Sequence, residues 1–271
     1  MKNLIKTSIA TLLVFVMASS CKKEDADQAL VERQITANEM ANGKNEFDNT
    51  GKQHNAFLDY YAQSSLKSGN NADVETLIRL ANEFYKNDTN DATQPTLRLS
   101  STILGNVQEE IIAIGGPYRP IDLCKRFPSL CNIFNPNPGP FIPFNILLSS
   151  EGSSTDRTLK FIDKIKSVEA ELLSTKGLKD DEKAALLAYY STARHSAAYW
   201  HNNLIASDNQ FWSKQDGLKA QFAKYPKDVI GADADGATIG GLLGTGFGPW
   251  GTVIGGVIGG AAASIWAASS K

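Results

Sequence analysis

The chain has few of the residues that usually carry catalysis or bind metals. Its 271 residues include three histidines and three cysteines. His195 and His201 are six positions apart, whereas one helix presents two ligands to a metal at a spacing of three or four. The sequence contains no HExxH, GxSxG or P-loop motif. We therefore expect a protein that is not an enzyme, with no cofactor and no metal.

The chain also lacks a large excess of positive or negative charge. There are 27 Lys+Arg residues and 29 Asp+Glu residues, without a basic stripe or an acidic block, so we expect no nucleic-acid partner. The hydrophobic content of 42% is sufficient for a folded core. One region lacks charge altogether, because no charged residue occurs from Gly236 to Ser270.

The first 21 residues have the composition of a signal peptide. Lys2 and Lys6 precede an apolar stretch that is too short to span a bilayer, and small residues lead to Cys21. This ending resembles a bacterial lipobox, in which Cys21 would be acylated, for example with palmitate, and become the first mature residue. Ala18 replaces the more usual Leu, and an ordinary secretory cleavage site is the alternative. The following "CKKEDAD" resembles the export signal of Bacteroidota surface lipoproteins, which implies an outer-membrane or cell-surface location. The periplasmic face stays open as an alternative.

The other two cysteines, Cys124 and Cys131, flank the short segment "KRFPSL". In an oxidising compartment they are expected to form a disulfide, which would stabilise the fold by roughly 2–3 kcal/mol. Two free thiols are the alternative. No histidine or further cysteine lies near them in the sequence to complete a zinc site.

Apolar residues recur with helical spacing over most of the body, which we place at residues 22–230. The clearest helices are predicted over 72–88, 95–116, 153–177 and 178–206. Residues 115–145 are an exception, because they hold most of the ten prolines and both body cysteines. We predict an all-α helical bundle crossed by an ordered, proline-rich loop.

Two short segments of the sequence resemble those of a known family. The segment "NEFDNTGKQHNAFLDYY" contains Gly51, His54 and Asn55, and "STARHSAAYW" ends in Tyr199 and Trp200. Both resemble uncharacterised lipoproteins of Bacteroidota, in which a glycine-rich hydrophobic C-terminus is also common. The resemblance marks these residues, with Leu58, Tyr61 and Ser196, as family motifs and implies no catalytic role. His54 lies on the apolar face of its predicted helix, where a hydrogen-bonded core histidine is favoured over a ligand.

The tail, residues 231–271, holds eleven of the 22 glycines between Gly236 and Gly260. Seven glycines form one stripe on a helix because they are spaced by four, with one step of three: Gly236, Gly240, Gly244, Gly248, Gly251, Gly255 and Gly259. Such stripes let helices approach closely, most often in membranes. Pro249 either breaks the segment into a glycine-zipper helical hairpin or kinks one long helix.

The tail resembles glycine-zipper domains of outer-membrane lipoproteins and membrane-permeabilising class II bacteriocins. It is expected to contact membrane or to pack on its own body, and the stripe could also support a homo-oligomer. The leading hypothesis is a non-enzymatic exported lipoprotein that is held at the outer membrane or cell surface. A toxin-like membrane-inserting protein is the second hypothesis. A ligand-binding or enzymatic body that uses the His54 region is the third.

Overall fold

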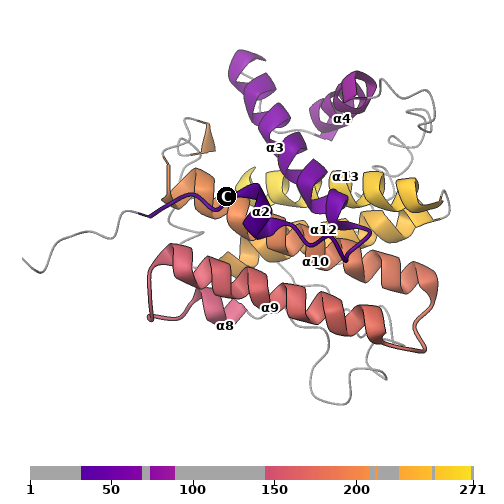
Figure 1. Ribbon diagram of the computed structural model, residues 1–271. Helices are drawn as coiled ribbons and strands as arrows, with labels where there is room; N and C mark the ends of the chain where they lie inside the picture. The colour runs from indigo at the N-terminus through magenta and orange to yellow at the C-terminus, as the bar shows by residue number, and fades with distance from the viewer. Residues whose placement is uncertain are drawn as a thin grey trace, which may run out of the picture. The chain divides into compact units, whose positions relative to one another are not determined.

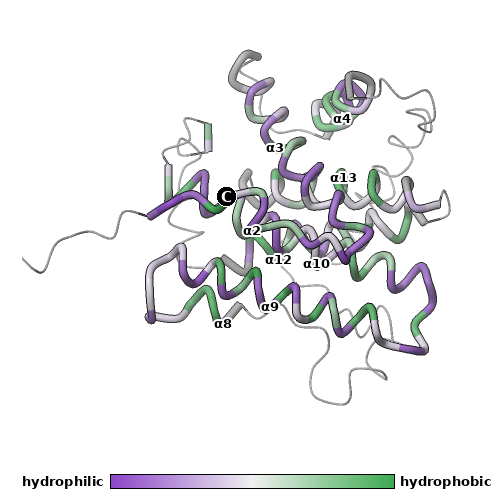
Figure 2. The backbone as a smooth tube through the Cα atoms, viewed as in Figure 1, coloured by the Kyte–Doolittle hydropathy of each residue, from purple (hydrophilic) through white to green (hydrophobic). Residues whose placement is uncertain are grey.

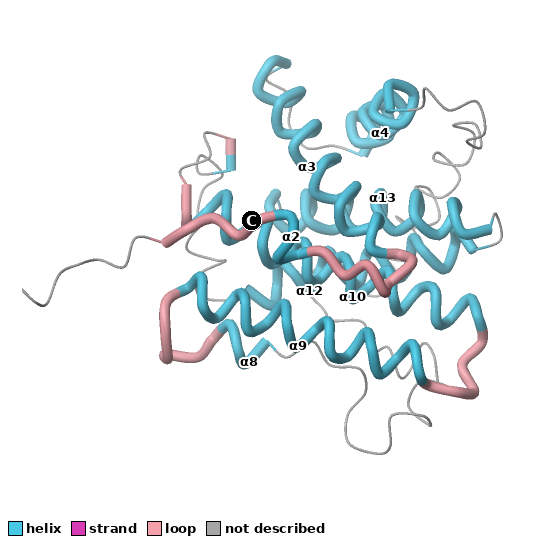
Figure 3. Tube along the Cα trace, viewed as in Figure 1, coloured by secondary structure: helices cyan, strands magenta, loops and turns pink. Residues whose placement is uncertain are grey.

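The computed structural model describes residues 32–68, 74–88, 144–207, 211–212, 226–245 and 248–269. In these ranges the chain forms helices and connecting loops without a strand (Figure 3), which confirms the predicted all-α helical bundle. Cys21, Cys124, Cys131 and the predicted helix 95–116 lie outside the described residues. So does the proline-rich loop, apart from its last two residues.

The helices follow the expected order along the chain (Figure 1). They are α2 (Ala37–Met40), α3 (Asp48–Ser68), α4 (Val74–Asp88), α8 (Phe144–Leu147), α9 (Ser154–Ser174), α10 (Asp180–Trp200), the π-helical turn η1 (His201–Ile205), α12 (Pro226–Thr245) and α13 (Gly248–Ser269).

Helix α10 is the centre of the bundle, because α3, α9, α12 and α13 all pack against it. Every side chain from Ala185 to Trp200 is buried. Small residues such as Ala188, Ala193 and Ala197 allow neighbouring helices to approach on several sides at once. A helix that is covered on all faces must satisfy its polar side chains internally.

Helix α9 covers α10 with one apolar face. A capping box closes its start, since Ser153 and Asp156 exchange hydrogen bonds with each other's backbone. Phe161, Ile162 and Ile165 are completely buried, and the alternation of apolar and polar residues along α9 is visible in Figure 2. The helix ends before Gly177, whose φ of 93° favours glycine.

The tail forms the predicted helical hairpin of α12 and α13. Pro249 stands at the second position of α13, where a missing backbone N–H costs no helical hydrogen bond. Helix α12 begins at Pro226, so the predicted body–tail boundary at 230/231 falls inside this helix. The hairpin also packs on α10 and α3, and it is therefore part of the bundle.

Candidate functional site

Six of the seven stripe glycines pair across the hairpin. Gly236 faces Gly259, Gly240 faces Gly255 and Gly244 faces Gly251. In each pair a Cβ on the α12 glycine would overlap the backbone carbonyl of its partner. The seventh, Gly248, begins α13 with a φ of 79° and has no atom close to the position of a Cβ. The stripe thus brings two helix backbones into direct contact, and Gly248 belongs to the turn.

A second glycine face of α13 meets α3. A Cβ on Gly256 would lie 2.8 Å from Thr50 Cγ2, and one on Gly260 would lie 2.9 Å from His54 Cδ2. Helix α3 in turn approaches α10 through Gly51, where a Cβ would lie 2.6 Å from the Ser191 carbonyl oxygen. The doubled glycines in "IGGVIGG" therefore serve two contacts. The first of each pair faces α12, and the second packs between α3 and α12.

The two segments that carry the family resemblance form opposite sides of the α3–α10 interface. The Gly51 N–H donates to Ser191 Oγ at 3.2 Å, and Asn55 Nδ2 donates to the His195 carbonyl oxygen at 3.0 Å. From the α10 side, the Tyr199 hydroxyl donates to Asp59 at 3.0 Å. Leu58 and Tyr61 are buried in the same core. These motif residues hold two helices together.

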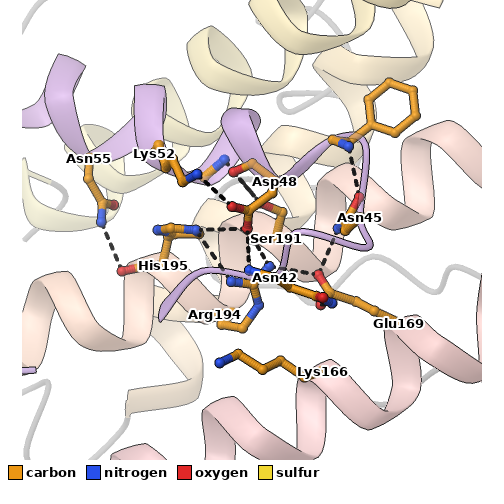
Figure 4. Close-up of polar contacts among 12 residues, drawn as sticks. Asn42, Asn45, Asp48, Lys52, Asn55, Lys166, Glu169, Ser191, Arg194 and His195 are labelled. Atoms are coloured by element: carbon orange, nitrogen blue, oxygen red, sulfur yellow. Dashed lines mark hydrogen bonds and ion pairs between the residues drawn. The ribbon is translucent and has the colours of Figure 1, made fainter. Parts of the chain in front are cut away.

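A buried ionic cluster, which we call the Arg194 cluster, joins α3, α9 and α10 through Asp48, Glu169, Arg194 and His195 (Figure 4). Arg194 Nη2 lies 2.7 Å from Asp48 Oδ1 and 3.0 Å from Glu169 Oε1. His195 Nε2 lies 3.1 Å from Asp48 Oδ1. Amides of the loop before α3 complete the cluster, because Asn42 and Asn45 donate to Glu169 at 2.6 and 2.7 Å.

Burial and hydrogen bonds act in opposite directions on the two titratable groups of this cluster that have a shifted pKa. Burial opposes ionisation of Asp48, but hydrogen bonds from His195, Lys52 and Arg194 outweigh it and hold the pKa of Asp48 well below its usual range. Burial lowers the pKa of His195 to about 4, although the bond to Asp48 favours the charged form. At neutral pH the Asp48 carboxylate is therefore charged beside a neutral His195.

A second buried group, the His54 couple, consists of His54 on α3 and Asp233 on α12. Asp233 Oδ2 accepts hydrogen bonds from Ser196 Oγ at 2.5 Å and from Trp200 Nε1 at 2.9 Å. Asp233 Oδ1 lies 3.7 Å from His54 Nε2. Both side chains of the couple are completely buried. The motif residues His54 and Trp200 therefore meet at a single carboxylate of the tail.

The third histidine, His201, lies where the start of the described chain meets α9. Its Nε2 is 3.1 Å from the Arg33 carbonyl oxygen. The Glu32 carboxylate accepts hydrogen bonds from the Ser154 and Thr155 backbone N–H groups at 2.7 and 2.8 Å. This carboxylate therefore occupies the N-terminus of α9, which favours a negative charge.

The chemistry of these groups is that of a packed core. The Ser196 hydroxyl donates to the Asp233 carboxylate, which satisfies this carboxylate inside the core. In the described part of the chain, no three side chains of His, Cys, Asp or Glu gather as metal ligands. Among the same residues, no helix combines the length and hydropathy needed to cross a membrane. No protein-family model, curated protein or solved structure matches this chain.

Sequence reasoning missed Asp48, Glu169, Arg194 and Asp233 as members of these two buried groups. A usable signal was present in "STARHSAAYW", where polar residues alternate with small ones along a helix that has no clear polar face. The motif "DADG" gave no such signal. It resembles part of a calcium loop, yet the structure places Asp233 in the interior of α12.

Proposed function

We propose that this chain is a non-enzymatic exported lipoprotein. Acylated Cys21 holds it at the outer membrane or cell surface, and its helical body is a rigid scaffold. One observation carries the non-enzymatic part of the proposal: the side chains that could perform chemistry are engaged in contacts inside the core. His54, His195 and His201 are all buried, and Asp48 and Asp233 bind neighbouring helices rather than an open site.

In this proposal the glycine tail is the core of the scaffold. Its stripe self-associates within one chain, because α12 and α13 already occupy each other's glycine faces. The second face of α13 is covered by α3. Membrane contact by the tail and homo-oligomerisation through the stripe stay predictions, and either would require the hairpin to leave its present partners.

The test is the membrane attachment of the full chain with Cys21→Ser. The wild-type protein should incorporate labelled palmitate and remain with membranes after high-salt and alkaline washing. The Cys21→Ser protein should lose the label and become soluble. If Cys21→Ser stays with membranes after both washes, the anchor is not the lipid and the proposal fails.

A leakage assay separates the scaffold from the toxin-like alternative. Purified Cys21→Ser protein is added to dye-loaded vesicles of phosphatidylethanolamine and phosphatidylglycerol. A scaffold should release no dye above the level of vesicles without protein. Dose-dependent release by the intact protein would favour a membrane-inserting function.

A further inference from the structure

Asn42 and Gly43 are the one Asn–Gly pair in the sequence, and they lie in the loop between α2 and α3. Asparagine loses its side-chain amide most readily when glycine follows it, because glycine has no side chain to shield its backbone nitrogen. Gly43 is exposed, and a Cβ built on it would have no atom within 4 Å. The Asn42 side chain and water therefore both have access to this peptide group.

The turn folds the Asn42 side chain back along the main chain. The Lys44 N–H donates to Asn42 Oδ1 at 3.2 Å, which is the hydrogen bond of an Asx turn. The ring closed by this bond contains both Asn42 Cγ and the Gly43 nitrogen. The Lys44 N–H also polarises the side-chain carbonyl and stabilises negative charge on Oδ1 during an attack on Cγ. The loop thus presents Cγ as an electrophile to the nitrogen of the next residue.

The nitrogen of the same amide faces the Arg194 cluster (Figure 4). Asn42 Nδ2 donates to Glu169 Oε2 at 2.6 Å, and Asn45 Nδ2 donates to Glu169 Oε1 at 2.7 Å. The Glu169 side chain is completely buried, and Arg194 Nη2 reaches the same Oε1 at 3.0 Å. Arg194 is also paired with Asp48 at 2.7 Å. One guanidinium therefore serves two carboxylates, and the loop amides supply further donors to Glu169.

We propose that Asn42 is a site of spontaneous deamidation in the folded chain, and that the carboxylate it produces releases the loop from Glu169. In the first step the Gly43 nitrogen bonds to Asn42 Cγ and the Cγ–Nδ2 bond breaks. The amide nitrogen leaves as ammonia and takes the proton of the Gly43 N–H. Water then opens the resulting succinimide at either carbonyl, which leaves aspartate or isoaspartate at position 42.

Either product removes a donor from Glu169 and adds a negative charge beside it. Aspartate places a carboxylate where Asn42 Nδ2 donated, and two carboxylates at hydrogen-bond distance repel each other. Isoaspartate also adds a methylene group to the main chain, which disturbs the turn bond from the Asn45 N–H to the Asn42 carbonyl oxygen. Because ammonia is lost, the change is permanent, and the share of molecules with a released loop grows with the age of the protein.

Peptide mapping by mass spectrometry tests the site on the mature chain with Cys21→Ser, which is kept folded at physiological temperature and pH for several weeks. The share of molecules with an acid at position 42 should rise steadily, with isoaspartate present beside aspartate. Asn45 is the internal control, because it lies in the same loop, donates to the same carboxylate and is followed by Glu46. It should keep its amide. An amide that persists at position 42 in the folded sample would overturn the proposal.

Gly43→Ala separates attack by the main-chain nitrogen from direct hydrolysis by water. The φ of Gly43 is not positive and its Cβ position is open, so this variant should fold as the wild type does. The added methyl group shields the nitrogen, and loss of the amide should therefore slow several-fold. Direct hydrolysis would proceed at an unchanged rate, and that result would exclude the Gly43 nitrogen as the nucleophile.

Asn42→Asp reproduces one product and tests its consequence. Its urea midpoint of unfolding should fall below that of Asn42→Ala, which loses the hydrogen bond without adding a charge. Asn49→Asp is the matched control, because Asn49 is exposed in the first turn of α3, where a negative charge is favoured. Its midpoint should not fall. Equal midpoints for Asn42→Asp and the wild type would overturn the release of the loop. None of these outcomes depends on lipidation at Cys21.

Discussion

Gly240 of α12 lies so close to Gly255 of α13 that a Cβ on either residue would overlap the backbone carbonyl of the other. This reciprocal contact defines what the glycine stripe does in the folded chain. It allows the two backbones to meet directly, and dispersion contacts along both helices follow from that approach. The stripe is thus a device for close packing inside the bundle.

Gly255→Ala should destabilise the protein by about 3 kcal/mol or more, because the new methyl group meets backbone that cannot rotate away. Gly241→Ala is the matched control on α12. Its Cβ would lie at an ordinary 3.6 Å from Thr252 Cγ2, and alanine is the better helix former by about 1 kcal/mol. Urea unfolding of both variants measures the difference. Equal stabilities would show that the stripe does not pack as described.

Arg194→Met should destabilise the fold by about 3–5 kcal/mol, because it leaves Asp48 and Glu169 in the core without their shared cation. Arg79→Met is the control. Arg79 pairs with Glu83 at 2.8 Å, but both side chains are exposed, so its loss should cost under about 1 kcal/mol. Thermal and urea unfolding distinguish the two. A similar small loss in both variants would contradict a structural role for the Arg194 cluster.

Stability should fall as the pH is lowered from about 6.5 to about 4. The pKa of His195 is lowered to about 4 in the folded chain, whereas an unfolded histidine has a value near 6.5. Between these values the unfolded chain binds one proton more than the folded chain. The free energy of unfolding therefore rises with pH, and the contribution of His195 is fully present above about pH 6.5. His195 alone accounts for about 3 kcal/mol of this change.

Burial also lowers the pKa of His201, which adds to the same trend. Urea titrations at half-unit pH intervals measure the slope. His195→Gln should reduce the slope between pH 4 and 6.5, and a slope identical to wild type would exclude His195 as its source. Below about pH 4 the lowered pKa of Asp48 should cause a further loss of stability, because its carboxylate becomes protonated on unfolding.

Cys124 and Cys131 should be oxidised to a disulfide in exported protein. With Cys21→Ser, alkylation of the denatured protein should add no label before reduction and two labels after it, as read by mass spectrometry. Replacing both cysteines by serine should cost roughly 2–3 kcal/mol, the value expected for a small closed loop. Labelling of both thiols without reduction would exclude the disulfide.

The helical pattern was predictable from the sequence because the period of the apolar residues is strong. The spacing over 72–88 and 153–177 gave helices that the structure places at Val74–Asp88 and Ser154–Ser174. The stripe of small residues also gave the hairpin, because spacings of four and a proline at position 249 are local features.

The buried polar contacts were not predictable in the same way. Asp48, Glu169 and Arg194 come from three helices that are far apart in the sequence, and their pairing depends on how those helices pack. Gly256 and Gly260 were not recognised as a second contact face, because the helix that covers them begins more than two hundred positions earlier. Local periodicity shows which side of a helix is buried but not what covers it.

The contact between α3 and α13 has a consequence for the time at which the protein can fold. The first long helix of the described chain packs against the last one. The contacts of Thr50 with Gly256 and of His54 with Gly260 therefore cannot form until α13 has been made. Contacts between residues so far apart in the sequence form slowly, because the chain between them must first close as a loop. Under the proposed export, a contact that forms only after α13 has been made leaves the bundle incomplete during synthesis, which favours passage through a translocation channel.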